Sequence, residues 1–529
     1  MELVSRWFKS CIESHSDCSI THEPVKMPTR LLELGVPTPE HVRLSSTAAT
    51  GTTSAYMTLS HCWGAAKFIK LTAETFPILS EGIHLSGLPK SFQDAVVIAK
   101  KLGVKNLWID SLCIYQDSLE DWQQEASKMG DVYKGGLCDI SAAGSDDSSG
   151  GCFYTRDPRL VDPCIFNTIF SDFENDEYHI RLEDYIEDGL HDDQTLFSRG
   201  WIVQERVLPA RVVHFGKNQV FWECKSNNSC ETYPAGITMG PSGPLSDGSV
   251  LTFSDYFGSL KTWNLDSGTS EELCAVWAQL VRVYSQCNLT RGSDKLVAIG
   301  GMAKEMNRAL GPNDRYLAGI WSGNILYQLL WYHGSDGAAS TGTRPEAYRA
   351  PSWSWASMDG VIDIDLPGPS PNLALNFHVT VRDVHIEQVT DDPFGQIREG
   401  FIRFCGPLVT LELEKSGDAL SWAHGYNAVM NGLCIKGRLY PEMDLGDERL
   451  PFLHFMPFHN SNLDGSQFVG LLLQPTGLVK GQFRRCGRLK MFERAVKLAG
   501  GPLWRDVKNH DWLEYESVDG EGRYIISVI

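Results

Sequence analysis

The sequence predicts an α/β core with a mainly parallel sheet and flanking helices, followed by a helical segment and a C-terminal antiparallel β-rich unit. Three observations predict this order. Strand-like apolar runs alternate with amphipathic helical runs over residues 55–144, which is the pattern of a parallel sheet covered by helices. Helical periodicity then dominates residues 271–310. Beyond residue 370 the apolar segments are short and rich in β-branched residues, as antiparallel strands are.

The core is expected to contain three strands joined by two helices. The strands are expected at residues 55–60, 106–110 and 138–144. The helices are expected at residues 88–103 and 118–135. Gly103 ends the first helix, and Ser118 and Asp121 form a capping box at the start of the second.

Two loop-rich stretches divide the chain. Residues 234–249 and 334–347 are rich in Gly, Pro and Ser, which are typical of boundaries between domains. Four regions are therefore expected: an N-terminal helical or extended segment, the α/β core, a helical extension and a β-rich domain, at residues 1–50, 51–233, 250–333 and 348–529.

Composition and charge argue against several classes of function. The 529-residue chain has a formal net charge of -19, which would repel a phosphate backbone, so nucleic acid is not expected as a partner. No apolar run is long enough for a signal peptide or a membrane span, so a cytoplasmic protein without membrane contact is expected. The 14 cysteines sit singly, mostly in apolar runs, and are expected to be reduced core residues.

Polar residues follow the first two strands of the core at their carboxyl ends, where open α/β sheets bind ligands. The residues that follow the first strand are Ser60, His61, Cys62, Trp63 and Gly64. Those that follow the second are Ser111, Cys113, Gln116 and Asp117. If the two strands are neighbours, these groups converge on a crevice with Asp110 at its floor.

Glu125 is a candidate acid or base. It lies three residues after Trp122 and four before Met129, beside the apolar stripe of its helix. Partial desolvation there would raise its pKa, as acid/base or oxocarbenium-stabilising chemistry requires. The alternative is a salt-bridged helix carboxylate.

A third group of candidates lies at residues 198–224, which predict a short helix ended by Pro209 and then a hairpin around "GKNQ". Charged and polar side chains crowd this helix, namely Arg199, Trp201, Gln204, Glu205 and Arg206. They are candidates for orienting a phosphate or a ribose. The favoured alternative is that these charges pair with one another and cap neighbouring elements.

The amino terminus carries a set of metal-ligand residue types. Cys11, His15, Cys18 and His22 are expected on one face of a single helix. Four ligands on one straight helix cannot all reach an ion at about 2 Å, so a metal site would need outside ligands. No metal site is assigned, and a face packed with Trp7 is favoured, with metal binding by Cys11, His15 and Cys18 left open.

Three blocks of the sequence stand out in their order and spacing. They are "LSHCWG" at 59–64, "LWIDSLCIYQDSLEDWQQEASKMGDVY" at 107–133 and "RGWIVQERVLPARVVHFGKNQVFWEC" at 199–224. Together they resemble the signature blocks of the fungal heterokaryon incompatibility (HET) domain. The resemblance extends through flanking stretches over residues 7–360. His61 stands where the family often has Tyr, and Tyr115 where it often has Asn; both bear on the shape of the expected pocket.

The resemblance implies a role in nonself recognition and programmed cell death when incompatible fungal cells fuse. HET domains are compared structurally with Toll/interleukin-receptor (TIR) domains, several of which cleave NAD, so a TIR-like, flavodoxin-like core is implied. By this analogy Glu125 corresponds to the helix Glu of TIR-like NADases. NAD(P) is then a candidate substrate, and no cofactor is firmly implied.

Three hypotheses follow. In the first, the chain is an NAD(P) glycohydrolase. Ser60, Trp63 and Gly64 line the crevice. Asp110 and Arg199 orient the ribose and the phosphates, and Glu125 stabilises the transition state.

In the second hypothesis, the chain is a non-enzymatic module that self-associates, with the β-rich unit recognising a protein partner. In the third, it is a Cys-dependent transferase or hydrolase with Cys62 or Cys113 as nucleophile, His61 or His214 as base and Asp110 as orienting group.

Overall fold

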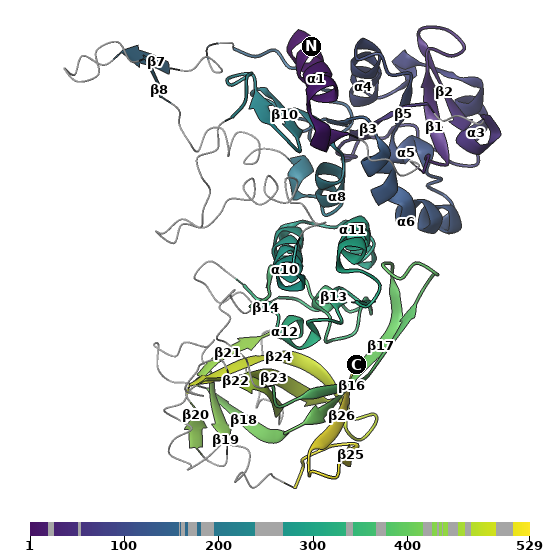
Figure 1. Ribbon diagram of the computed structural model, residues 1–529. Coiled ribbons are helices and arrows are strands. Elements are labelled where there is room, and N and C mark those ends of the chain that lie inside the picture. Colours follow the sequence, from purple (N-terminus) through teal and green to yellow (C-terminus); the bar gives the residue numbers. More distant parts are fainter. Residues whose placement is uncertain are drawn as a thin grey trace. The chain divides into compact units, whose positions relative to one another are not determined.

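The computed structural model describes much of the chain, in ranges separated by gaps. The described residues are 1–19, 26–50, 54–157, 159, 164–167, 177–180, 195–237, 268–334, 342–366, 377–415, 426–430, 433–435, 437–442, 453–460, 467–492 and 511–529. The chain divides into two compact units (Figure 1). Unit 1 comprises Met1–Asn264, Cys287–Leu289 and Ala298–Met302, and unit 2 comprises Leu265–Gln286, Thr290–Val297 and Ala303–Ile529.

Unit 1 contains a nine-stranded sheet in the order β11-β10-β9-β6-β3-β5-β1-β2-β4. Its strands are β1 Arg30–Leu34, β2 His41–Ser46, β3 Met57–Ser60, β4 Ile83–His84, β5 Asn106–Trp108, β6 Asp139–Ser141, β9 Arg211–Phe215, β10 Val220–Cys224 and β11 Asn228–Cys230. A separate two-stranded sheet pairs β7 Cys164–Asn167 with β8 Glu177–Ile180. The helices are α1 Glu2–Ser14, η1 Ser16–Cys18, α2 Thr47–Thr50, α3 Phe76–Glu81, η2 Leu85–Gly87, α4 Lys90–Lys101, α5 Asp110–Cys113, α6 Leu119–Gly135, η4 Thr195–Ser198 and α8 Ile202–Val207.

The nine-stranded sheet is mixed, and the expectation of a mainly parallel sheet is therefore wrong. Its centre is parallel, because β3 pairs in parallel with β5 and with β6, and β6 pairs in parallel with β9. The strands on both sides of this centre are antiparallel. The β1–β2 and β9–β10–β11 connections are too short for the crossover that a parallel pair needs, which explains the antiparallel edges.

The three expected core strands are confirmed as β3, β5 and β6, and the two expected helices as α4 and α6. Ser118 caps α6 as predicted, since its side chain accepts a hydrogen bond of 3.2 Å from the backbone N of Asp121. Apolar side chains of α1, α4 and α6 pack with the central strands into one core. The expected short helix and hairpin are also confirmed, as α8 followed by β9 and β10.

The expected single N-terminal helix through His22 is wrong. Helix α1 ends at Ser14, and His15 adopts an extended conformation with φ −103° and ψ 104°. A short turn, η1, follows. The sequence Ser14-His15-Ser16-Asp17 explains this end, because Ser and Asp side chains compete for backbone hydrogen bonds and disfavour helix interiors. His22 lies outside the described residues.

Unit 2 combines helices with an antiparallel β-rich sheet, as the sequence predicts. Its helices are α10 Ser270–Gln286, η6 Gly292–Asp294, α12 Ile325–Gln328 and η7 Trp355–Ser357, and α11 Gly300–Leu310 belongs to it from Ala303 onward. The short strands are β12 Tyr316–Leu317, β13 Ile320–Trp321, β14 Tyr332–His333 and β15 Ile362–Asp363, paired as β12-β13 and β14-β15.

The larger sheet of unit 2 has the order β16-β17-β26-β24-β23-β22-β18-β19-β20, with β21 paired to β24 and β25 to β26. Its strands are β16 Thr380–Gln388, β17 Ile397–Gly406, β18 Val409–Lys415, β19 Tyr426–Met430, β20 Leu433–Ile435, β21 Gly437–Pro441, β22 Leu453–Asn460, β23 Gln467–Pro475, β24 Gln482–Phe492, β25 Ser517–Val518 and β26 Tyr524–Val528. All its described pairings are antiparallel except that of β24 with β26. Within the described ranges, no helix has the length and apolarity to cross a membrane.

Candidate functional site

The carboxyl ends of β3 and β5 lie side by side, and polar groups from the two strands meet there. Trp63 Nε1 donates a hydrogen bond of 3.0 Å to Asp110 Oδ2, and His61 Nδ1 lies 3.9 Å from Asp110 Oδ1. Ser60, His61 and Cys62 are buried, whereas Trp63 is half-buried and Gly64 is exposed. The predicted convergence of the residues after these two strands is thus found for Asp110, His61 and Trp63.

Gly64 shapes the turn that follows β3. Its φ is +60°, in the left-handed region that favours glycine. A Cβ at this position would lie 2.2 Å from Cβ of Asp147, so a side chain does not fit. The turn therefore depends on glycine for both its conformation and its close approach to Asp147.

Arg199 and Glu205 join this group from the segment that includes α8. Arg199 Nη1 donates a hydrogen bond to the backbone carbonyl of His61. Glu205 is 3% exposed, and burial raises its pKa to about 7, assisted by the negative charge of Asp110 and opposed by Arg199. A carboxyl that titrates near neutral pH is suited to acid–base chemistry.

Two hydroxyls lie near the Glu205 carboxyl. The hydroxyls of Ser60 and Tyr133 both lower the pKa of Glu205. Ser60 Oγ is buried without a hydrogen-bond partner among the described residues. Burial raises the pKa of Tyr133 well above its ordinary value, and Glu205 raises it further, so Tyr133 stays a neutral donor. We call Ser60, His61, Asp110, Tyr133, Arg199 and Glu205 the acid–base centre.

The Arg199 guanidinium offsets part of the negative charge of the acid–base centre. Burial lowers the pKa of Arg199, but the charges of Glu205 and Asp110 outweigh this effect and raise it. Burial lowers the pKa of His61 to about 4, against the attraction of Asp110, so the imidazole is neutral at pH 7. The centre therefore combines the Arg199 guanidinium with the neighbouring carboxyl groups of Asp110 and Glu205.

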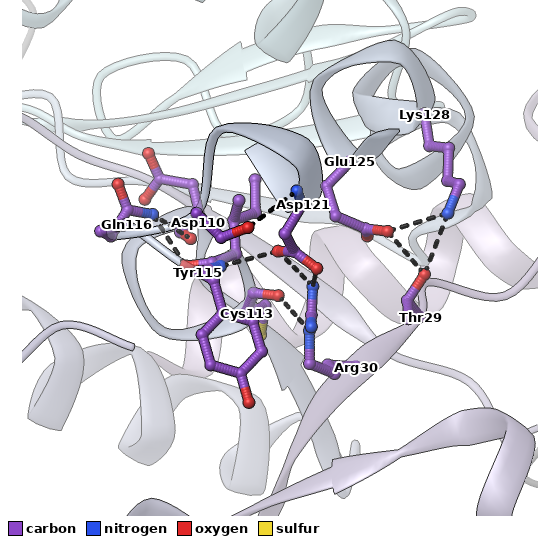
Figure 2. Close-up of polar contacts among 11 residues, drawn as sticks. Thr29, Arg30, Asp110, Cys113, Tyr115, Gln116, Asp121, Glu125 and Lys128 are labelled. Carbon is purple, nitrogen blue, oxygen red and sulfur yellow. Dashed lines mark hydrogen bonds and ion pairs between the residues drawn. The ribbon is translucent and has the colours of Figure 1, made fainter. Parts of the chain in front are cut away.

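Glu125 is buried on α6 but lies in a different set of contacts. Its Oε1 accepts hydrogen bonds of 2.8 Å from Thr29 Oγ1 and 2.8 Å from Lys128 Nζ. Figure 2 shows the carboxylate pointing to these two residues and away from Asp110. This is the salt-bridged arrangement given above as the alternative, and a catalytic role for Glu125 stays a prediction.

Arg30 from β1 holds the segment between α5 and α6. Its Nη2 donates to both carboxylate oxygens of Asp121, at 2.7 and 2.6 Å, and its Nε donates to the backbone carbonyl of Cys113 at 2.7 Å (Figure 2). Gln116 Nε2 donates to the carbonyl of Ile114 at 2.9 Å. Asp121 Oδ2 also accepts a hydrogen bond of 2.8 Å from the backbone N of Tyr115, so the side chains of Gln116 and Asp121 order the loop between α5 and α6.

The two candidate nucleophilic cysteines are buried thiols. Burial raises the pKa of Cys62 to about 11 and that of Cys113 to about 12. The thiolate is the reactive form of cysteine, and at neutral pH these pKa values leave almost none of it. His214, a candidate base, has its Nε2 3.1 Å from Glu223 Oε2.

The remaining candidates lie on or next to α8. Trp201 is half-buried at the start of this helix, and Gln204 is 1% exposed. Arg206 Nε donates a hydrogen bond of 2.9 Å to Glu223, so the favoured alternative, pairing among local charges, accounts for Arg206.

The sequence did not predict the burial and raised pKa of Glu205. Every residue of α8 is buried, so the helix has no apolar stripe that would distinguish a buried face from an exposed one. Tyr133 was not predicted either, because its spacing on α6 indicates only core packing.

The residues of the acid–base centre fall within one match to a known family. Residues 56–205 match the family model described as "Heterokaryon incompatibility protein (HET)". This span includes the two candidate carboxylates, Asp110 and Glu205. It confirms the resemblance for the first two sequence blocks and for residues 199–205 of the third. Comparison with curated proteins and with solved structures found no match in either set.

Proposed function

Because residues 56–205 form a HET domain, we propose that the protein acts in fungal nonself recognition and cell death by hydrolysing NAD(P) at the acid–base centre. One observation carries this proposal: Glu205 is a buried carboxyl whose pKa is raised to about 7 beside Arg199 and Asp110. Titratable groups with strongly shifted pKa values concentrate at catalytic sites. The centre lies at the carboxyl ends of parallel strands, where α/β sheets bind nucleotides.

The proposed reaction breaks the bond between ribose C1′ and the nicotinamide nitrogen. The electron pair of this bond leaves with nicotinamide, and the ribose becomes an oxocarbenium-like cation. The Glu205 carboxylate stabilises this positive charge electrostatically. Water then adds to C1′ and gives its proton to Glu205, and the products are nicotinamide, ADP-ribose (or its 2′-phosphate) and a proton.

The neighbouring residues have separate roles in this proposal. Asp110 accepts hydrogen bonds from the ribose hydroxyls, and Arg199 binds the phosphates. Trp63 is half-buried and lines the edge of the site together with Ser60 and Gly64. The neutral hydroxyl of Tyr133 orients the Glu205 carboxylate.

Nicotinamide release from NAD and NADP, followed by chromatography, tests the proposal. Glu205→Gln keeps the shape of the side chain and is expected to lower turnover at least 100-fold. Glu125→Gln is the matched control, because it changes another buried carboxylate of the same unit, and its turnover is expected to stay within a few-fold of the wild type. Loss of turnover in the Glu125 variant alone would instead assign catalysis to Glu125. No turnover by the wild-type protein at micromolar concentration contradicts an NADase.

A second function, a non-enzymatic signalling module, is favoured by the burial of the acid–base centre. Ser60, His61 and Glu205 are 1%, 2% and 3% exposed. Such burial suits a polar network that stabilises a domain acting by self-association or by binding a protein partner. A concentration-dependent change of oligomeric state in sedimentation, without NAD turnover, is the result expected for this function. The third hypothesis, a Cys-dependent enzyme, loses support because both candidate thiols are protonated at neutral pH.

A further inference from the structure

Four metal-ligand side chains converge where the N-terminal segment of unit 1 meets the end of β10. They are Cys11, His15, Cys18 and Cys224, and their ligand atoms all lie within 4.8 Å of one another. We propose that these four residues form a structural zinc site with three thiolate ligands and one imidazole ligand. Three sulfurs and one nitrogen in tetrahedral arrangement are the donor set typical of structural zinc.

Two of the distances between ligand atoms agree with a tetrahedron around one ion, and the others are at most 4.8 Å. Zinc–sulfur bonds of about 2.3 Å and zinc–nitrogen bonds of about 2.0 Å require S···N edges of about 3.5 Å and S···S edges of about 3.8 Å. His15 Nδ1 lies 3.5 Å from Cys224 Sγ and 3.9 Å from Cys18 Sγ. Both distances are close to the required S···N edge, so small side-chain movements suffice to bind an ion.

The end of helix α1 makes this arrangement possible. Cys11 is in the last turns of α1, and the helix stops at Ser14, so His15 and Cys18 follow on an extended residue and a short turn. This bend removes the obstacle that four ligands on one straight helix would meet. Cys224, the last residue of β10, is the outside ligand. Cys224 thus takes the fourth ligand position, in place of His22 of the set expected from the sequence.

A buried arginine beside the four ligands complements the negative charge of the proposed zinc–thiolate group. Three thiolates and one zinc ion have a net charge of about −1. Arg211 is 3% exposed, and its Nε donates a hydrogen bond of 3.2 Å to Cys11 Sγ, while its Nη2 donates to the carbonyl of Cys18 at 2.8 Å. Its Nη1 donates a third hydrogen bond, of 3.2 Å, to the carbonyl of Leu137, so among the described residues Cys11 is the acidic group that the guanidinium contacts. A buried guanidinium requires an anionic partner, and the zinc–thiolate group supplies it.

Hydrogen bonds also orient the ligands, as is usual around metal sites. Cys18 Sγ lies 3.6 Å from Ser226 Oγ. Cys11, Cys18 and Cys224 are buried free thiols, whereas His15 is half-buried. The imidazole therefore forms the side of the site that is open to an entering ion.

Zinc at this position would fasten the N-terminus to the sheet of unit 1. His15 and Cys224 are 209 residues apart in sequence, so the ion closes a long loop of the unfolded chain. The same two segments already pack through Trp7 and Trp222, whose ring centroids are 6.4 Å apart. Metal binding is thus coupled to the stability of unit 1, and it does not depend on NAD turnover.

The test is the metal content of the whole chain, purified without chelators and measured by mass spectrometry of the elements. The wild type is expected to carry about one zinc per chain. Cys224→Ser and His15→Ala are expected to lose most of it. The matched control is Cys230→Ser, which removes a buried cysteine of the adjacent strand β11 outside the four-residue set, and its zinc content is expected to be unchanged.

A further variant separates loss of a ligand from loss of folding. His15→Cys supplies a fourth thiolate at the half-buried position, and it is expected to retain zinc where His15→Ala does not. In cobalt-substituted protein, thiolate-to-cobalt charge-transfer absorption is expected for the wild type and for His15→Cys. A folded, reduced wild-type chain that carries no zinc and takes up neither zinc nor cobalt overturns the proposal. Full zinc content in Cys224→Ser, or a disulfide among the three cysteines in freshly isolated protein, overturns it as well.

Discussion

Trp63 Nε1 donates a hydrogen bond of 3.0 Å to Asp110 Oδ2, and this contact joins the end of β3 to the first residue of α5. The same carboxylate accepts a hydrogen bond of 2.6 Å from the backbone N of Ser111. Asp110 is thereby fixed by donors from the segments that follow two neighbouring parallel strands, β3 and β5. Its orientation in the acid–base centre depends on both donors.

Trp63→Phe removes the indole donor and keeps an aromatic ring beside Phe68, whose centroid is 6.0 Å away. We expect the free energy of unfolding to fall by about 1.5 kcal/mol, because the hydrogen bond to an ionised carboxylate is lost. Urea denaturation measures this change. Trp201→Phe, at another half-buried indole of unit 1, is the control, and an equal loss in both variants would contradict a specific contribution from the contact with Asp110.

Gly64→Ala is expected to destabilise unit 1 more than Gly103→Ala does. Both glycines have positive φ, +60° and +80°, so both substitutions incur backbone strain of about 1 kcal/mol. A Cβ at Gly64 also meets Asp147 at 2.2 Å, whereas a Cβ at Gly103 meets no heavy atom within 4 Å. We expect an additional loss of about 1–3 kcal/mol at Gly64 from this overlap, measured by chemical denaturation. Equal losses for the two variants would show that Asp147 moves aside without cost.

The raised pKa of Glu205 predicts a specific dependence of stability on pH. Its pKa is about 7 in the folded chain and about 4.5 when unfolded, so the folded state binds more protons between these values. The stability that Glu205 contributes is therefore complete below pH 4.5 and is lost as pH rises through 7, by at most about 3 kcal/mol. Unfolding of the wild type and of Glu205→Gln, compared from pH 5 to pH 8, isolates this contribution. The wild type should lose stability relative to the variant across that range, and parallel curves would contradict the raised pKa.

Much of the core of unit 1 could be predicted from the sequence because its signals are local. Helical spacing in α4 and α6, the Ser118 cap and the apolar strands β3, β5 and β6 are properties of short windows. The β9–β10 hairpin at one edge of the sheet was predicted as well, but the antiparallel pairing at the other edge could not be predicted from a local pattern. Strand β1 pairs with β5 through residues such as Leu32 and Leu107, which are 75 positions apart, and no local pattern encodes that contact.

The candidate site residues also differ in whether a local sequence signal predicts their environment. The meeting of Asp110 with Trp63 and His61 follows from a general rule about the ends of parallel strands, so it was predictable once the strands were assigned. The environment of Glu205 was not predictable, since it depends on burial of the whole of α8 and on Tyr133 from α6. Cys224 likewise joins Cys11 and His15 through the tertiary fold, more than 200 residues along the chain.

In unit 2, a buried ion pair predicts a large effect of a single substitution. Arg485 and Glu442 are each 1% exposed, and Arg485 Nη1 donates to Glu442 Oε1. The Arg485 guanidinium also lies 3.6 Å from the centroid of the Trp331 ring. Arg485→Met leaves the Glu442 carboxylate buried with Arg344 as its remaining cation, and we expect the free energy of unfolding to fall by about 3–5 kcal/mol.

The matched control for Arg485→Met is Arg398→Met, which breaks the pair of Arg398 with Glu387. These side chains are 60% and 42% exposed, so a loss within about 1 kcal/mol is expected. The double substitution Arg485→Met with Glu442→Leu should recover part of the loss, because it removes the stranded carboxylate together with its partner. Denaturation curves of the four proteins, including the wild type, measure these differences. If the free energy of unfolding falls no more for Arg485→Met than for Arg398→Met, the prediction is contradicted. Such a result would mean that water reaches the Glu442 carboxylate in the variant and replaces the lost cation.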